Sequence, residues 1–343
     1  MKISPIADKI LLPLAPTIAG TIADYLQLMT QEVYIYLSQN CDNVDPDLLQ
    51  NRFWHWQFEK SIRLVSTSQY QYVSAIAHRL AAKLSLTPLE ICQNLQPDSS
   101  AVIVDPNFCL ELCCWYNDAG YIYFQISPRS IAVWLNYIHD LPLNLQLGTI
   151  AARDDDLSPL GSVNLAIYAH ARCCSLLKLA DAEKLVAITA NWQITTPDQS
   201  IGVNDRRYLK NLGITELTSI FEHSVEYRLI HALMEVLDGL YGDNLQIVSP
   251  EQSKLSRAEV VESTGGIVRR NSSEKIRPPN WTKLTIDLAQ SWLEFYRHCR
   301  IFGDLNSQNP RLAIARCGLT AISRRYLQVL LENYLGIKAS IEL

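Results

Sequence analysis

The residues with the clearest chemical potential lie near the carboxyl end of the chain, where aromatic and arginine side chains follow one another. Trp292, Tyr296, Arg297 and Arg300 fall within a single short stretch. An aromatic ring can stack on a nucleobase and a guanidinium group can neutralise a phosphate, so this combination is typical of a contact with RNA. Three later arginines are candidates for further contacts with an RNA backbone, namely Arg316, Arg324 and Arg325.

Two amphipathic helices must position these side chains. Apolar residues recur at steps of three or four within Leu284–Cys299 and within Leu312–Leu330, and this period predicts two helices that each bury one face. Trp292 lies on the apolar face, so we assign it to the core rather than to an RNA contact. Gly303 and Pro310 mark a loop between the helices, and Gly336 marks the end of the second one.

Composition and charge restrict how the chain can bind nucleic acid. The chain has 343 residues, enough for two domains, and 48% of them are hydrophobic while 19% are charged. The net charge of −5 is uneven, with −7 over residues 1–159 and +2 over residues 160–343. A general electrostatic attraction to nucleic acid is therefore not expected. Any RNA contact should use local basic patches, and we expect no binding to DNA.

Cysteine spacing and hydropathy indicate the compartment. The nine cysteines include two neighbouring pairs but no Cys-x-x-Cys spacing, so we expect neither a metal site nor a disulfide framework. No apolar run approaches the ~18–20 residues of a membrane helix. The first residues lack the pattern of a signal peptide, because Pro13 and Pro16 interrupt their apolar stretch. We therefore expect a cytoplasmic protein without a membrane contact.

The first half predicts a small α+β domain over residues 1–145. Strands are expected where β-branched and aromatic residues gather, over Ala101–Val104, Phe108–Trp115 and Tyr121–Ser127. A turn over Asn117–Gly120 connects the last two strands. Helices are expected over Pro13–Asn40 (in two stretches), Tyr72–Leu84 and Pro128–Ile138, and another begins at Thr87, where Glu90 completes a capping box.

The second half predicts an all-α bundle over residues 161–343, after a charged linker over residues 146–160. Helices are expected around Val163–Leu177, over Ala182–Ala190 and over Glu216–Leu240. The polar segment Gly242–Pro279 carries Arg269 and Arg270, and it is either a solvated loop or a contact with an RNA backbone. The predicted fold class is mainly α, with a small α+β domain followed by an all-α helical bundle.

Several motifs in the second half resemble the DALR-type anticodon-binding domain of arginyl-tRNA synthetases. Tyr168–Arg172 reads Tyr-Ala-His-Ala-Arg, like the segment with which that domain begins. Leu288–Arg300 is similar to the family's Ala-x-x-Phe-Asn-x-Phe-Tyr-x-x-Cys helix, although Leu293 stands where the family has Asn. Leu335–Ile337 is similar to the Leu-Gly-Ile ending. The resemblance implies a tRNA contact near the anticodon loop, and a packing role for His170 rather than a metal-binding one.

Motifs in the first half resemble the amino-terminal additional domain of the same family. Pro88–Ile91 and Gly120–Phe124 are similar to its Pro-x-Glu-Ile helix start and its Gly-aromatic-Ile-Asn-Phe strand. In the family, the aromatic residue and the Asn of this strand face the D-loop of the tRNA. Tyr121 matches the aromatic residue, and Tyr123 replaces the Asn, so that stacking takes the place of hydrogen bonding to a base edge. Alternatively, Tyr121 and Tyr123 simply cover one face of the sheet.

The synthetases carry a catalytic nucleotide-binding domain between these two parts, and this chain has no room for it. Leu135–Gly161 spans fewer than thirty residues, whereas each βαβ unit of such a domain needs roughly 30. The chain contains no His-x-Gly-His motif, no Walker loop and no Gly-x-Gly-x-x-Gly motif. We therefore expect no catalytic residues, no cofactor and no enzymatic activity of the chain alone.

The resemblance implies a non-catalytic paralogue of arginyl-tRNA synthetase that binds a tRNA, such as tRNA-Arg. Two alternatives remain open. The chain could be a protein-interaction module that no longer binds RNA, with a synthetase or another protein as its partner. It could also be an accessory subunit in aminoacylation by a separate catalytic protein. The acidic net charge and the replaced asparagines, at Leu293 and Tyr123, favour the first alternative.

Overall fold

The computed structural model describes residues 10–11, 17–40, 61–66, 70–84, 86–95, 101–104, 109–141, 160–190, 192–195, 221, 223–242 and 279–342. The described part is mainly helical and has a small sheet in its first half, which confirms the predicted fold class. Arg269, Arg270 and residues 146–159 of the predicted linker lie outside the described residues.

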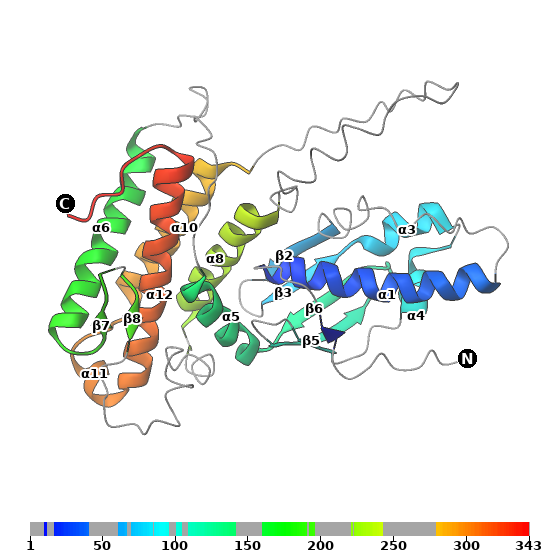
Figure 1. The fold of residues 1–343 in the computed structure, drawn as a ribbon, viewed down its shortest axis with the longest axis horizontal. Helices are drawn as coiled ribbons and strands as arrows, with labels where there is room; N and C mark the ends of the chain where they lie inside the picture. The colour runs from blue at the N-terminus through cyan, green and yellow to red at the C-terminus, as the bar shows by residue number, and fades with distance from the viewer. Residues whose placement is uncertain are drawn as a thin grey trace, which may run out of the picture.

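A six-stranded sheet forms the centre of the first half (Figure 1). Its spatial order is β1 (Ile10–Leu11), β4 (Ala101–Val104), β5 (Cys109–Tyr116), β6 (Ile122–Ile126), β3 (Gln71–Ser74) and β2 (Ile62–Ser66). The β1–β4 pair is parallel and the other neighbouring pairs are antiparallel. The three strands that we predicted are confirmed as β4, β5 and β6.

Helices cover one face of this sheet and leave the other face partly exposed. The covering helices are α1 (Ile18–Asn40), α3 (Ile76–Leu84) and α4 (Pro88–Leu95), which pack on one another (Figure 1). Tyr25 of α1 meets Phe124 of β6 edge to face, with ring centroids 6.4 Å apart. Along β6, buried residues alternate with less buried ones, so Tyr123 and Gln125 point to the other face.

Two predictions for the first half were wrong in detail. The predicted helix Tyr72–Leu84 begins as strand β3, and α3 starts only at Ile76. Tyr72 and Ser74 are buried while their neighbours are less so, which is the two-residue period of a strand, and Val73 pairs with Tyr123 of β6. The two helical stretches expected over Pro13–Asn40 are a single helix, α1.

The turn between β5 and β6 depends on Gly120. Its φ is +80°, and a methyl group placed on its Cα would overlap Cβ of Pro88 at the start of α4. Glu90 accepts hydrogen bonds from the backbone nitrogen and hydroxyl of Thr87, both at 2.7 Å, so the capping box that holds Pro88 in place is also present.

We therefore expect Gly120→Ala to lower the free energy of unfolding by about 2–3 kcal/mol, because it combines a left-handed alanine with an overpacked contact. Gly336→Ala is the matched control, since Gly336 has a φ of +65° but no atom near its added methyl group. Only the backbone cost of about 1–2 kcal/mol should appear there. Urea denaturation of the two variants measures the difference, and equal losses would contradict the role of Pro88.

The second half is a helical bundle that carries one small two-stranded hairpin. Its helices are α6 (Leu160–Ala182), α8 (Ser224–Gly242), α10 (Trp281–His298), α11 (Asp304–Gln308) and α12 (Pro310–Val329), which continues into the π-helical turn η4 (Leu330–Tyr334). The hairpin pairs β7 (Ala187–Ile188) with β8 (Ile194–Thr195). Gly336 follows η4 with a φ of +65°, which confirms the predicted stop.

Two helix boundaries differ from the prediction. The short helix expected over Ala182–Ala190 is absent, because α6 continues to Ala182 and the chain then reverses through Lys184, whose φ is +58°, into β7. The helix expected over Glu216–Leu240 begins at Ser224 and ends at Gly242. Residues 216–220 lie outside the described part of the chain.

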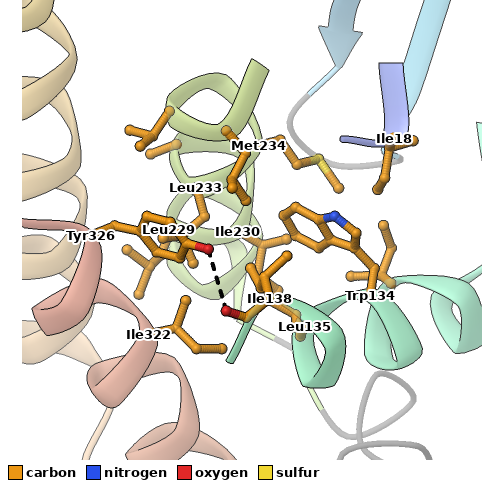
Figure 2. Packing of buried hydrophobic residues seen from close by; sticks show 14 of the residues in the cluster. Ile18, Trp134, Leu135, Ile138, Leu229, Ile230, Leu233, Met234, Ile322 and Tyr326 are labelled. Atoms are coloured by element: carbon orange, nitrogen blue, oxygen red, sulfur yellow. Dashed lines mark hydrogen bonds between the residues drawn. The ribbon is translucent and has the colours of Figure 1, made fainter. Parts of the chain in front are cut away.

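The sheet and the bundle share one apolar core, and α5 (Pro128–Asp140) joins them. Figure 2 shows Trp134, Leu135 and Ile138 of α5 facing residues of α8, including Ile230, and Tyr326 of α12. Trp134 is completely buried. The two predicted domains therefore meet through a large apolar contact.

Polar contacts hold the end of α5 against α12. The last carbonyl groups of a helix have no partners within the helix. The guanidinium group of Arg325 donates hydrogen bonds to the carbonyl oxygens of His139 and Leu141, and the Tyr326 hydroxyl donates to that of Ile138 at 3.3 Å. A cation is favourable at this end of a helix dipole. Burial lowers the pKa of Arg325.

Candidate nucleic-acid interface

Helix α10 positions the aromatic and arginine residues that the sequence singled out. Asn280 caps its start by accepting a hydrogen bond from the backbone nitrogen of Lys283 at 2.9 Å. Trp292 and Phe295 are buried, which confirms that Trp292 belongs to the core. Tyr296 is half-buried next to this face, and Arg297 lies one residue further round the helix, where it is exposed.

Tyr296 is the meeting point of α10 and α6. The Arg172 guanidinium group donates through Nε to the Tyr296 hydroxyl oxygen at 3.1 Å and also through Nη2, and it lies 5.1 Å from the ring centroid. The Tyr296 ring stacks on Trp292 at 5.5 Å and 10°. These hydrogen bonds raise the pKa of Arg172. Tyr168, one turn earlier on α6, exposes 42% of its surface.

Further cationic residues lie at the carboxyl end of α10. Arg297, His298 and Arg300 are all exposed. Among the described residues, no carboxylate forms an ion pair with the side chain of Arg297 or Arg300. The nearby Arg228, in contrast, pairs with Glu294 at 2.8 Å. The ring of His298 stacks on that of His223, just before α8, at 6.0 Å and 18°. We call Tyr168, Arg172, Tyr296, Arg297 and Arg300 the α6–α10 surface.

The other three arginines of the predicted site bind the protein itself. Arg316 pairs with the buried carboxylate of Glu226 at 2.7 Å, and Arg325 binds the end of α5 as described above. Arg324 is only 6% exposed, donates to Gln328 at 2.8 Å and lies 4.4 Å from the ring centroid of Trp192. All three guanidinium groups therefore have internal partners, and the expectation that they contact an RNA backbone stays a prediction.

The two candidate aromatic residues of the first half have different surroundings: Tyr123 lies on the less covered face of the sheet, and Tyr121 lies just before β6, beside α3. Tyr123 stacks on Trp115 of the neighbouring strand at 5.6 Å and 10°, and its hydroxyl accepts a hydrogen bond from Asn117 at 3.3 Å. Tyr121 is exposed and lies 4.6 Å from the ring of His78. Tyr123 covers the sheet and is half-buried beside Trp115, whereas Tyr121 presents its ring to solvent next to α3.

Sequence reasoning missed Trp115 as a member of this group. The register of the β5–β6 hairpin would have identified it, because Trp115 is paired directly with Tyr123. Its side chain is 38% exposed. The group Trp115, Tyr121 and Tyr123 lies on the sheet, and no contact between it and the α6–α10 surface is seen among the described residues.

His170 and most of the described cysteines are buried, whereas Cys113 is exposed. His170 is 1% exposed, and its Nδ1 lies 2.7 Å from the Ser340 carbonyl oxygen, to which it donates. Burial lowers the pKa of His170. Burial likewise raises the pKa of the Cys317 thiol to about 12. Within the described ranges, no three His, Cys, Asp or Glu side chains are grouped so that they could hold a metal ion.

No helix among the described residues is both long and apolar enough to cross a membrane. Comparison with known proteins finds no matching family model, no matching curated protein and no matching solved structure. The function of this chain must therefore be inferred from its own residues and their arrangement.

Proposed function

We propose that this chain is a non-catalytic tRNA-binding protein related to arginyl-tRNA synthetases, and that it holds RNA on the α6–α10 surface. The observation that carries the proposal is the combination of two exposed arginines, Arg297 and Arg300, with the Arg172–Tyr296 contact beside them. Tyr168 and Arg172 belong to the Tyr-Ala-His-Ala-Arg segment, whose resemblance to the synthetase motif supports the proposal.

The chemistry of this surface suits a strand of RNA with exposed bases. Each stacked base contributes about 1–3 kcal/mol, and each neutralised phosphate adds affinity that falls with salt. Tyr168 offers an exposed ring, while Arg297 and Arg300 offer charges that no carboxylate of the described residues neutralises. The second half has a net charge of only +2, so these local groups, rather than a general field, would attract the RNA.

The spacing between the two parts supports a protein that does not aminoacylate by itself. Only residues 141–159 separate α5 from α6, and a nucleotide-binding α/β domain needs several units of roughly 30 residues each. The direct packing of α5 between the sheet and the bundle is the arrangement expected when no further domain separates them.

A binding titration with matched variants tests the proposal. Arg297→Gln/Arg300→Gln should weaken binding to a tRNA-Arg transcript about 10-fold at low salt, and should reduce the slope of log K against log salt by about 1.5–2. The control is Lys283→Gln/Lys338→Gln, which removes the same charge from exposed positions outside the α6–α10 surface. Equal losses in both double variants would indicate non-specific attraction and contradict the proposed site.

A second candidate function is favoured by the exposed aromatic group on the sheet. Trp115, at 38% exposure, and Val65 of β2, at 54% exposure, present apolar surface. Such a face suits a protein partner, for example a separate synthetase that this chain assists. Recovery of a protein partner after nuclease treatment, together with no tRNA binding, would support this function over the first.

A further inference from the structure

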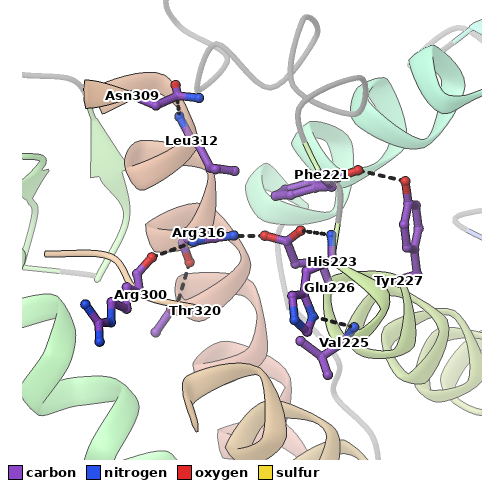
Figure 3. Close-up of polar contacts among 10 residues, drawn as sticks. All are labelled: Phe221, His223, Val225, Glu226, Tyr227, Arg300, Asn309, Leu312, Arg316 and Thr320. Carbon is purple, nitrogen blue, oxygen red and sulfur yellow. Dashed lines mark hydrogen bonds and ion pairs between the residues drawn. The ribbon is translucent and has the colours of Figure 1, made fainter. Parts of the chain in front are cut away.

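One buried carboxylate connects three helices at the end of the bundle that carries the α6–α10 surface. Glu226 of α8 is completely buried (Figure 3). Its carboxylate accepts hydrogen bonds from the backbone nitrogen of His223 at 2.9 Å and from Nε of Arg316 in α12 at 2.7 Å. The buried Cys299 at the end of α10 is close enough for this carboxylate to affect its thiol. Burial and this neighbouring carboxylate raise the pKa of the Cys299 thiol to about 12.

The position of Glu226 explains how a charged group can remain buried. His223 precedes α8, so the hydrogen bond from its backbone to Glu226 is the second arm of a capping box. The start of a helix favours a negative charge, because its first N–H groups have no partners within the helix. The charge of Arg316, whose side chain is 11% exposed, provides the rest of the compensation that a buried carboxylate needs.

Arg316 extends this connection to the backbone beyond α10. Its Nη1 donates a hydrogen bond to the carbonyl oxygen of Arg300 at 2.7 Å (Figure 3). The ion pair of Glu226 and Arg316 is therefore connected to the backbone of residue 300 through a hydrogen bond of Arg316. The segment is also anchored by Ile301, which is 4% exposed in the apolar core, whereas Arg300 itself is exposed and has this backbone contact with Arg316.

We propose that Glu226 and Arg316 are positioning residues, which fix the backbone at Cys299 and Arg300 so that the arginines of the α6–α10 surface face RNA in one arrangement. This proposal rests on the proposed function. A surface that is already ordered loses less conformational entropy when it binds a ligand. In this proposal Arg316 binds the carbonyl oxygen of Arg300 and does not itself contact the RNA.

Substitution of the pair as a whole separates positioning from stability. Glu226→Leu/Arg316→Met removes both charges together, and replacing a buried pair with apolar residues often leaves a protein stable. In this variant we expect amide hydrogen exchange of residues 299–303 to become about 10-fold faster or more. We also expect affinity for the tRNA transcript to fall about 3- to 10-fold, although Arg297 and Arg300 are unchanged.

Two further variants complete the experiment. Arg316→Lys keeps the positive charge but has a single nitrogen in place of the guanidinium fork, so it should fold and yet show the same faster exchange at residues 299–303. Arg316→Lys also tests the positioning role if the Glu226→Leu/Arg316→Met variant does not fold. Arg228→Gln/Glu294→Gln is the control, because it removes an ion pair between α8 and α10 that does not contact residues 299–300. That control should leave both the exchange and the affinity unchanged.

The outcomes of the two measurements are distinguishable. Unchanged exchange at residues 299–303 in the Glu226→Leu/Arg316→Met and Arg316→Lys variants overturns the positioning role. Faster exchange with unchanged tRNA affinity overturns it as well, because the order would then have no effect on binding. If the wild-type protein binds no tRNA, the proposed function fails, and so does the proposal that the pair positions arginines for RNA. Faster exchange at residues 299–303 in the variants would then still show that the ion pair orders this segment.

Discussion

Replacement of Trp134 by alanine is expected to lower the free energy of unfolding by about 3–5 kcal/mol, the range for removing a buried tryptophan. Trp134 is completely buried between the sheet and the bundle, where α5 contacts α8 and α12. The cost combines the lost burial of the indole ring with the cavity that rigid neighbours cannot fill. Domains of this kind have total stabilities of about 5–15 kcal/mol, so the variant should unfold at a much lower urea concentration.

The matched control is the same substitution at an exposed position. Trp115→Ala removes a ring that is 38% exposed and stacked on Tyr123, so the expected loss is about 0.5–1.5 kcal/mol. Circular dichroism during urea denaturation measures both losses. If the two variants lose similar amounts of stability, the shared core between the two halves is refuted. It is also refuted if replacing Trp134 shifts the unfolding transition of only one half of the protein.

Removal of Arg316 alone is expected to cost about 3–5 kcal/mol, because it leaves the Glu226 carboxylate buried without its ion-pair partner. The side chains of this pair are 11% and 0% exposed, so solvent screens their interaction very little. Arg316→Met should therefore be far less stable than the wild-type protein. Glu226→Leu/Arg316→Met should recover most of the loss, because no buried charge remains.

Denaturation of the single and double variants measures this coupling directly. The exposed pair formed by Arg228 and Glu294, with side chains 48% and 44% exposed, provides the comparison. Removing Arg228 alone should cost no more than about 1 kcal/mol, as is usual for surface ion pairs. A small effect of Arg316→Met, or a double variant that is no more stable than the single one, would contradict the buried pair as described.

Local signals in the sequence predicted much of the fold. The three- to four-residue period of apolar residues predicted α10 and α12. The capping box at Thr87 predicted the start of α4, and the turn that ends at Gly120 predicted the β5–β6 hairpin. These features depend on residues close together in the chain. Their physical causes, namely one buried helix face, side-chain caps and a left-handed glycine, can therefore be read without the rest of the structure.

The features that the sequence did not reveal depend on distant partners. Tyr72 and Val73 fit a helix pattern, and only pairing with β6 makes them a strand. Arg325 looks like a free cation in the sequence, yet the carbonyl oxygens that it binds belong to α5. Likewise, the role of Arg316 depends on a glutamate on another helix. Charge alone does not distinguish an arginine that faces solvent from one that caps a helix or compensates a buried carboxylate.

The direct test of the central proposal is the affinity of the full chain for a tRNA-Arg transcript, measured by fluorescence anisotropy across a range of salt concentrations. The α6–α10 surface predicts saturable binding that weakens as salt increases, and that weakens further when Arg297 and Arg300 are both replaced by glutamine. Absence of binding at the lowest salt concentration would contradict the proposal that this protein is a tRNA-binding one.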